Sequence, residues 1–263
     1  NFYHLLICSM INQKSEDNKS QETELNFSKY AHIYDKHAQL QKLMADKLAS
    51  FIPINTPEKI LEIGCGTGMF TKYLLSLKVN KIFLNDVSSG MIEYMETKLC
   101  LPPYSQIIIG NAELLKFQVV DMVAANAVFQ WFKDPGEFLK RLNSYIKPNG
   151  KLIFSTFGPA SLAELRKFGS LESPALLLSS SECCHLIKEA GFPIDFFARK
   201  THKLFFANTL ALLKNLQQLG VAPTKMTSPR ELRQLIKNYD NAYFTKQGVY
   251  ANWELLFFSA KKN

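Results

Sequence analysis

The segment ILEIGCGTG (residues 60–68) is the most informative part of the sequence for predicting the fold. A strand-like run leads into three alternating glycines, and helix-compatible sequence follows to Leu77. Glycines are needed where a turn is tight and where a ligand lies against the backbone. Glu62 stands just before the first glycine, and Asp86 ends the next predicted strand, 22 residues after Gly64. Because a carboxylate there can accept both hydroxyl groups of a ribose, the segment predicts a site for a nucleotide-like cofactor.

Segments typical of strands alternate with segments typical of helices as far as residue 157. This alternation predicts βαβ units, a parallel sheet and helices on both of its faces. We expect an α/β, Rossmann-like fold with a mostly parallel seven-stranded sheet, an N-terminal helix, and a helical cap between the last two strands. The predicted strands are 59–63, 81–86, 105–110, 119–127, 151–157, 199–206 and 251–262; the predicted helices are 24–51, one ending at 77, 88–99, 135–146, 161–168, 180–191, 208–220 and 228–239.

Length and composition favour one folded domain. The chain has 263 residues, 47% of them hydrophobic and 21% charged, which suits a large buried core and not a disordered chain. We expect a disordered extension over 1–23, with Met10 as the natural start, and a single domain over 24–263 in which 207–248 is the cap. The apolar runs are shorter than the roughly 18 residues of a membrane span. Five cysteines make no disulfide framework, so we expect a cytoplasmic protein that contacts no membrane.

The positive charge is concentrated near the C-terminus. Residues 190–263 hold 11 Lys/Arg against 4 Asp/Glu, a balance of +7, whereas residues 1–189 carry +1. Such asymmetry is typical either of a surface that meets an acidic partner or of an ordinary solvated lysine-rich surface. The charge alone leaves both interpretations open.

The pattern E-x-G-x-G-x-G resembles motif I of the class I S-adenosylmethionine-dependent methyltransferases. NDVSSGM (85–91) resembles that family's segment at the end of the second strand, and GNAELL (110–115) resembles its adenine-contacting segment, with Asn111 where Asp is common. The resemblance implies S-adenosylmethionine as cofactor, S-adenosylhomocysteine as product, and no metal. The cofactor-binding residues that it implies are Glu62, Gly64, Cys65, Gly66, Gly68, Asp86, Val87, Met91, Asn111, Ala112 and Asn126.

Four further segments resemble the malonyl-acyl-carrier-protein O-methyltransferases of biotin synthesis, and the resemblance covers roughly residues 24–263. The segments are FSKYAHIYDKHAQLQ (27–41), NAVFQWF (126–132), STFGPASLAELR (155–166) and LLKNLQQLGV (212–221). The resemblance implies methyl transfer to the free carboxylate of a malonyl group on an acidic carrier protein, which would dock on the basic C-terminal region. A free carboxylate is ionised at neutral pH, so this reaction needs no general base.

The candidate catalytic residues come from two of these segments. Tyr34, His37 and Gln41 share one face of a predicted helix, which could close the site or simply pack. Gln130 and Trp131 follow the fourth strand, at the edge of the sheet where open α/β folds bind ligands. A buried core position is an equally good interpretation of Trp131. Tyr34, Gln130, Trp131 and His37 are the main candidates and Gln41 a weaker one.

Other functions remain to be weighed against this one. The chain could methylate another small carboxylic acid, or be a catalytically silent assembly protein that keeps the methyltransferase fold. RNA methylation is disfavoured, because neither an RNA-binding appendage nor an N-P-P-Y-type motif is evident. Cys183, Cys184 and His185 cannot enclose a metal by themselves. We expect a monomer that binds no nucleic acid.

Overall fold

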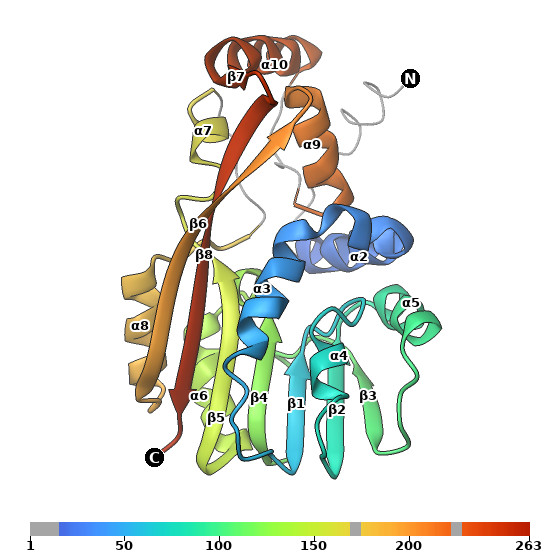
Figure 1. The fold of residues 1–263 in the computed structure, drawn as a ribbon, viewed down its shortest axis with the longest axis vertical. Helices are drawn as coiled ribbons and strands as arrows, with labels where there is room; N and C mark the ends of the chain where they lie inside the picture. The colour runs from blue at the N-terminus through green and yellow to red at the C-terminus, as the bar shows by residue number, and fades with distance from the viewer. Residues whose placement is uncertain (1–15, 169–174, 222–227) are drawn as a thin grey trace.

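The computed structural model describes residues 16–168, 175–221 and 228–263. Its centre is one mixed sheet with the strand order β3-β2-β1-β4-β5-β8-β6, to which the two-residue β7 adds by pairing with β8 (Figure 1). Strands β1 to β5 are parallel, and β8 runs antiparallel between β5 and β6. The predicted mostly parallel sheet is therefore confirmed. The strands are β1 Lys59–Ile63, β2 Lys81–Asp86, β3 Ser105–Ile109, β4 Val120–Asn126, β5 Ile146–Phe157, β6 Ile194–Phe206, β7 Phe244–Thr245 and β8 Gly248–Lys261.

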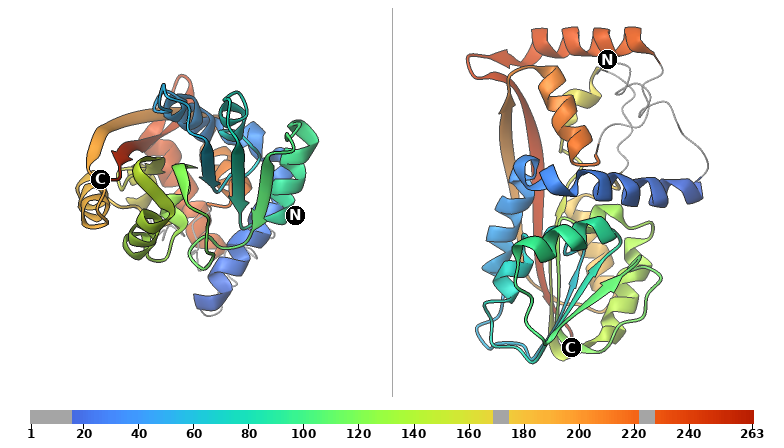
Figure 2. Two further views of the ribbon diagram at one scale, coloured as in Figure 1. Left: turned by 90° about the horizontal axis from the view of Figure 1, so that it is seen from below. Right: turned by 90° about the vertical axis from the view of Figure 1, so that its right-hand side faces the viewer.

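Helices cover both faces of the sheet, as predicted (Figure 2). Successive side chains of a strand point to opposite faces, so Ile60 packs in one core layer and its neighbour Leu61 in the other. The first layer is closed by α3 Gln39–Ala49, α4 Thr71–Leu74 and α5 Ser89–Lys98; the second is closed by α6 Pro135–Tyr145 and α8 Ser180–Glu189. Burial on both faces explains why the central strands read as nearly continuous apolar runs.

The N-terminal helix differs from its prediction in two ways. It begins at Glu16, so α2 (Glu16–His37) takes in residues 16–23 that we expected to be disordered; residues 1–15 of that extension lie outside the described part of the chain. The stretch 16–23 contains no Gly or Pro, and the helix can therefore extend outward from its anchored half. The predicted single helix 24–51 is also interrupted at the fully buried Ala38, where ψ is 43°. The break lets α2 cross the ends of the strands while α3 packs along the sheet (Figures 1 and 2).

The cap is larger than the predicted insertion 207–248. Strands β6 and β8 begin earlier than expected and extend beyond the other strands as a long antiparallel pair (Figure 1). Helices α7 Ala163–Arg166, α9 Thr209–Gln218 and α10 Pro229–Tyr243 pack against that extension. Their shared core contains Leu165, Leu212, Leu216, Leu235, Tyr239 and Trp253. Burial of this apolar surface fixes the cap over the edge of the sheet where the strands β1, β2 and β4 end.

Candidate functional site

The three glycines of the turn after β1 have positive φ angles of 65°, 53° and 84°, but their surroundings differ. A Cβ on Gly64 would lie 2.2 Å from Cγ2 of Val128, and one on Gly68 would lie 2.5 Å from Cδ1 of Leu99. A Cβ on Gly66 would meet nothing within 4 Å. Gly64 and Gly68 are therefore required by packing, whereas Gly66 faces open space into which a ligand can approach the backbone.

Asp86, at the end of β2, is held directly beneath this turn. Its Oδ2 accepts a hydrogen bond from Gly66 N at 2.8 Å, and its Oδ1 accepts one from Ser88 N at 2.9 Å. The carboxylate is 8% exposed. Each carboxylate oxygen can accept more than one hydrogen bond, so the group can still receive ribose hydroxyls. The open face at Gly66 and the fixed acid beside it fit the adenosyl part of S-adenosylmethionine.

Glu62 is a buried acid on the same side of the turn. It is 1% exposed, and Thr71 Oγ1 donates to its Oε2 at 2.8 Å. Burial, with a smaller effect from Asp86, raises the pKa of Glu62 to about 8, against the opposing effect of the Thr71 hydrogen bond. The side chain is therefore largely protonated at neutral pH and stabilises the turn as a neutral group.

The remaining predicted cofactor residues include Val87, Met91, Asn111 and Ala112. Val87 lies partly exposed beside Asp86, and Met91 lies in the first turn of α5, where Ser88 Oγ accepts from Met91 N at 3.2 Å. Oδ1 of Asn111 accepts from Glu113 N at 2.9 Å, which shapes the loop that contains the buried Ala112.

Cys65 and Asn126 contribute to the site through their positions. The Cys65 side chain packs in the core beneath the turn, and burial raises the pKa of its thiol. Nδ2 of Asn126 donates to Gln41 O at 3.0 Å, and its Oδ1 accepts from Ser155 Oγ at 2.8 Å. The Asn126 amide therefore joins α3 to the sheet, and its contact with the cofactor stays a prediction.

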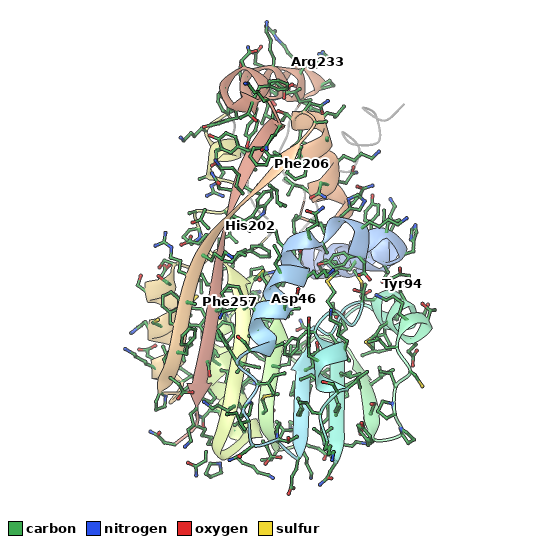
Figure 3. All side chains as sticks on the ribbon, viewed as in Figure 1. Asp46, Tyr94, His202, Phe206, Arg233 and Phe257 are labelled. Atoms are coloured by element: carbon green, nitrogen blue, oxygen red, sulfur yellow. The ribbon has the colours of Figure 1, made fainter. Side chains whose placement is uncertain are left out.

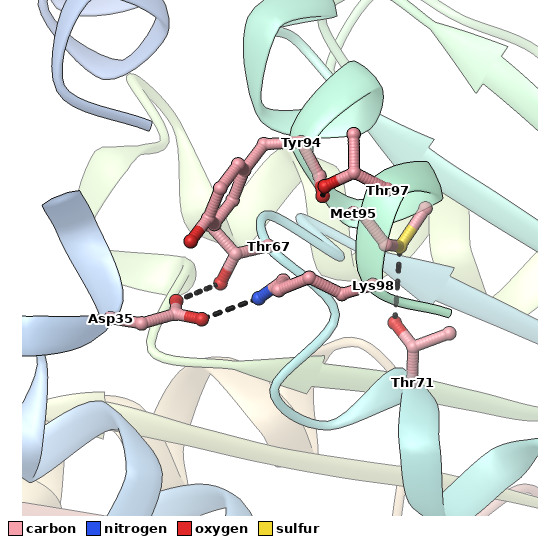
Figure 4. A network of polar contacts seen from close by, with 7 residues as sticks. All are labelled: Asp35, Thr67, Thr71, Tyr94, Met95, Thr97 and Lys98. Carbon is pink, nitrogen blue, oxygen red and sulfur yellow. Dashed lines mark hydrogen bonds and ion pairs between the residues drawn. The ribbon is translucent and has the colours of Figure 1, made fainter. Parts of the chain in front are cut away.

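Helix α2 is fastened over the glycine turn by polar contacts (Figure 4). Thr67 Oγ1 donates to Asp35 Oδ1 at 2.5 Å, and Lys98 of α5 forms an ion pair with the same carboxylate. The hydroxyl groups of Ser28 and Ser88 are 2.8 Å apart. Asp35 and Ser28 have no signal in the sequence, because nothing in the local pattern shows which side of α2 faces a turn more than 30 residues away.

Tyr34 and Gln41 lie at this covered edge of the sheet. Burial raises the pKa of Tyr34 well above its ordinary value; Asp86 and Asp35 raise it further, and a hydrogen bond from Gln41 opposes them. Tyr34 is therefore a hydrogen-bond donor at neutral pH and cannot serve as a base. Oε1 of Gln41 is buried without a hydrogen-bond partner among the described residues. An unpaired buried acceptor is costly, so this atom is a candidate contact for a bound ligand.

The other three catalytic candidates are placed differently from one another. Trp131 packs edge-to-face against Phe27 of α2, with ring centroids 5.3 Å apart. Gln130 is buried and its amide is used internally: Nε2 donates to Ala127 O at 2.6 Å, and Thr156 Oγ1 donates to Oε1 at 3.0 Å. These hydrogen bonds let Gln130 position the turn η1 (Phe129–Trp131), and its contact with a substrate stays a prediction. The ring of His37 faces α9, where its Nδ1 lies 3.2 Å from Nδ2 of Asn215.

Metal ligands and membrane-spanning helices would mark two other kinds of site. Within residues 16–168, 175–221 and 228–263, no group of three or more His, Cys, Asp or Glu side chains is placed to hold a metal ion. Over the same ranges, no helix is long and apolar enough to cross a membrane. The expectation of a metal-free reaction stays a prediction.

Comparison with known proteins agrees with this geometry. Residues 61–154 match the family described as "Methyltransferase domain". The chain is 34% identical over 235 residues to malonyl-[acyl-carrier protein] O-methyltransferase 1 of Ilyobacter polytropus, covering 85% of this chain and 86% of the relative. It is 33% identical over 263 residues to malonyl-[acyl-carrier protein] O-methyltransferase of Priestia megaterium, covering 90% and 95%. The YcgJ protein of Bacillus subtilis has a similar fold, with a TM-score of 0.64 at 12% identity over 84% of this chain and 98% of that protein.

The likeness to these relatives extends well beyond the glycine turn. It takes in the N-terminal helix and the cap as well as the sheet, since 90% of the chain aligns with the Priestia protein. The chain belongs to the malonyl-[acyl-carrier protein] O-methyltransferases, a family of class I S-adenosylmethionine-dependent methyltransferases.

Proposed function

We propose that the protein transfers the methyl group of S-adenosylmethionine to the free carboxylate of malonyl-acyl-carrier protein, giving the malonyl methyl ester that primes biotin synthesis. The observation that carries this proposal is the open backbone at Gly66 beside the fixed Asp86 carboxylate, in a chain that aligns over 85–90% of its length with malonyl-[acyl-carrier protein] O-methyltransferases. The protonation of two groups near this site agrees with it. Tyr34 and Glu62 both have raised pKa values and keep their protons at neutral pH. Neither can remove a proton from a nucleophile, so the site suits a nucleophile that is already ionised.

The residues divide into those that hold the cofactor and those that hold the acceptor. Asp86 and the backbone at Gly66 would hold the adenosyl part, and Asn111 would meet the adenine edge. The cofactor supplies, when bound, a methyl group activated on a sulfonium. The Tyr34 hydroxyl and the Trp131 indole N–H would orient the malonyl carboxylate as donors, and the cover formed by α2 would exclude water.

The cap offers one continuous basic surface for an acidic carrier. Arg230, Arg233 and Lys237 are exposed at i, i+3 and i+7 of α10 and so share one face of the helix. Arg233 marks this face at the end of the molecule farthest from the parallel strands (Figure 3). We propose that the carrier protein docks here. Lys225, which also belongs to the basic region, lies outside the described residues.

The rest of the +7 balance is spread over other surfaces. Arg199 forms an ion pair with the buried Glu254 at 2.5 Å. Lys262 donates to the carbonyl oxygens of Asn143 and Ile146 at 2.6 and 2.8 Å. Such groups stabilise the fold, so the net charge of the C-terminal region overstates the size of a docking surface.

The direct test is incubation with labelled S-adenosylmethionine and, separately, malonyl-carrier protein, malonyl-coenzyme A and succinyl-carrier protein, with the methyl ester detected by mass. We expect the ester from the malonyl thioesters. Equal or faster methylation of a free dicarboxylic or tricarboxylic acid would instead support the alternative of a small-acid methyltransferase. Calorimetry that detects no cofactor binding would support a silent assembly protein.

The docking surface has its own test. Changing Arg230, Arg233 and Lys237 together to Glu should slow the reaction of malonyl-carrier protein at low salt and leave that of malonyl-coenzyme A unchanged, because charge steering is screened over about 10 Å at 0.1 M salt. The control carries the same charge change at Lys78, Lys140 and Lys188, which are exposed away from the cap. Equal losses on both substrates would exclude α10 as the docking surface.

Two further proposals concern the oligomeric state of the protein and its location in the cell. We propose that it acts as a monomer and in the cytoplasm, where the other components of fatty-acyl carrier chemistry are found. Light scattering on the purified protein and fractionation of cells test these two points.

A further inference from the structure

A groove separates the end of α2 from the cap. Its volume is about 400 Å³. It lies beside the cofactor site, because α2 lines the groove with its last turn and covers the glycine turn with the preceding ones. The groove is lined by Lys36, His37, Gln39, Leu204, Phe205, Phe206, Ala211, Lys214, Asn215 and Gln218.

The charged side chains at this groove are all basic. Lys36 and Lys214 come from different helices, and no acidic residue is among the described residues that line the groove. Both lysines lower the pKa of His37, adding to the larger effect of burial. His37 is therefore neutral at pH 7. Since the amide nitrogen of Asn215 can only donate, Nδ1 of His37 accepts and its Nε2 carries the ring proton. Two ammonium groups and an imidazole N–H donor are the groups that bind a phosphate.

The other lining residues add two kinds of contact. Leu204, Phe205 and Phe206 come from the end of β6 next to the cap, where Phe206 is marked in Figure 3. Phe205 is 42% exposed, a large apolar side chain left open to solvent. Gln39 and Gln218 bring side-chain amides, which both donate and accept. A ligand that suits this lining has one phosphate, a branched aliphatic part and amide groups along a flexible chain.

The phosphopantetheine arm of a carrier protein has this composition. A phosphodiester joins the arm to the carrier, a dimethyl-substituted carbon follows, and two amides lead to the thioester at the far end. His37 follows Tyr34 by three residues on α2, a rise of about 4.5 Å along the helix. Because the extended arm is much longer than this rise, a phosphate held in the groove leaves the thioester end within reach of the covered edge of the sheet where Tyr34 lies.

We propose that this groove binds the phosphopantetheine arm of the acylated carrier protein, with Lys36, Lys214 and His37 holding its phosphate and the end of β6 contacting its dimethyl group. The proposal rests on the proposed function, in which a carrier-borne malonyl group is the acceptor. It adds a binding site distinct from both the cofactor cleft and the basic face of α10.

Three malonyl thioesters can separate a contact with the phosphate from contacts with the rest of the carrier protein. Malonyl-carrier protein and malonyl-coenzyme A both contain the pantetheine phosphate, and malonyl-pantetheine lacks it. In the double variant Lys36→Gln/Lys214→Gln, we expect kcat/KM for each phosphorylated substrate to fall about tenfold relative to that for malonyl-pantetheine. The control Lys42→Gln/Lys188→Gln removes two exposed lysines outside the groove and should leave both ratios unchanged.

A binding measurement makes the result independent of catalysis. Calorimetry should show that free phosphopantetheine binds the wild-type protein more tightly than pantetheine, and that the double variant loses this difference. If phosphopantetheine has no advantage, the groove is not a phosphate site, even if malonyl-carrier protein is methylated.

The other outcomes also decide the proposal. A loss confined to malonyl-carrier protein would mean that Lys36 and Lys214 meet the acidic surface of the carrier, and an equal loss on all three substrates would mean that they support the fold; both overturn the phosphate site. If the wild-type protein methylates none of the three thioesters but still prefers phosphopantetheine, the proposed function fails and the binding site stands.

Discussion

The glycine turn and the helical cover, by which we mean α2 together with α9, are held together by contacts of different range. Hydrogen bonds in the turn join residues close in sequence: 20 positions separate Gly66 from Asp86, and 9 separate Glu62 from Thr71. Those of the cover span 60 positions between Ser28 and Ser88 and 178 between His37 and Asn215. The turn is thus formed by neighbouring segments of the sheet, whereas the cover depends on the whole fold.

This difference suits the order of events in a methyltransferase. A cofactor site that is already formed loses little conformational entropy when the cofactor binds. A cover fastened by a few polar side chains can open for exchange at modest cost, because partly exposed ion pairs contribute only about 0–1 kcal/mol. Variants of the turn should therefore change cofactor affinity strongly. Variants of the cover should mainly change the rates at which the cofactor binds and dissociates.

The largest effect is expected at Gly66. Gly66→Val should abolish cofactor binding measured by calorimetry, because its side chain would fill the open face of the turn. The left-handed backbone adds a cost of about 1–2 kcal/mol for a residue with a Cβ, so circular dichroism should still show a folded protein. Gly64→Val is the matched comparison. The Cβ of this valine would meet Val128, so we expect the Gly64→Val variant to lose both cofactor binding and the fold. Normal cofactor binding by Gly66→Val would place the cofactor elsewhere.

Asp86→Ala should weaken cofactor binding by about 1.5–3 kcal/mol for each charged hydrogen bond lost, or roughly tenfold or more per bond. The variant Asp86→Asn keeps one acceptor oxygen for the turn and loses the charge, and we expect an intermediate affinity. Titration calorimetry measures both. Unchanged affinity in the alanine variant would show that this carboxylate does not hold the ribose.

The pH dependence of stability tests the burial of Glu62. Its pKa is raised from the ordinary 4.5 to about 8 in the folded protein, so the folded state binds more protons than the unfolded state between these values. The stability contributed by its proton is fully present below pH 4.5 and is lost as the pH rises through 8. The Tm of the wild-type protein should therefore fall from pH 5 to pH 8 more steeply than that of Glu62→Gln. Parallel curves for the two proteins would contradict a raised pKa.

The smallest effect is expected at the fastening of the cover. Asp35→Asn keeps an acceptor for Thr67 but removes the charge that pairs with Lys98, whose side chain is 31% exposed. We expect cofactor dissociation in stopped-flow experiments to become a few-fold faster, with a change in unfolding free energy of about 0–1 kcal/mol. Asp46→Asn, which weakens an exposed pair with Lys72 outside the cover, is the control. A large loss of affinity in Asp35→Asn would mean that the cover belongs to the cofactor site itself.

The sequence predicted the strands of the parallel sheet closely, because strands buried on both faces have a strong apolar signal and the intervening turns contain glycine or proline. It was less accurate at the edges. Strand β6 begins five residues before its predicted start because residues 194–198 pair with the C-terminal part of β8 inside the main sheet, and β8 begins three residues early because Gly248 and Val249 pair with β7. The break at Ala38 was missed because alanine favours a helix, and only the packing of α2 and α3 on different parts of the sheet requires a bend there.

In the site too, some features can be predicted from the sequence and others cannot. Spacing alone marks Gly66, Asp86 and Glu62; in the structure Gly66 is hydrogen-bonded to Asp86, and Glu62 is buried close to the same turn. Gln130 was proposed for its ability to form hydrogen bonds and Asn126 from the family resemblance, and the amides of both form hydrogen bonds within the protein. The chemistry of a side chain is visible in the sequence, but its hydrogen-bond partners are not.

The α/β fold, the glycine turn and the acid that faces it can be predicted from the sequence, because they depend on apolar periodicity and on backbone conformations that few residues other than glycine adopt. The glycine that faces open space, the hydrogen-bond partners of the amides and the places where basic residues gather depend on the tertiary structure. Those properties arise from contacts such as Phe27 with Trp131 and His37 with Asn215. Residues far apart in the chain make these contacts, and no local pattern records them.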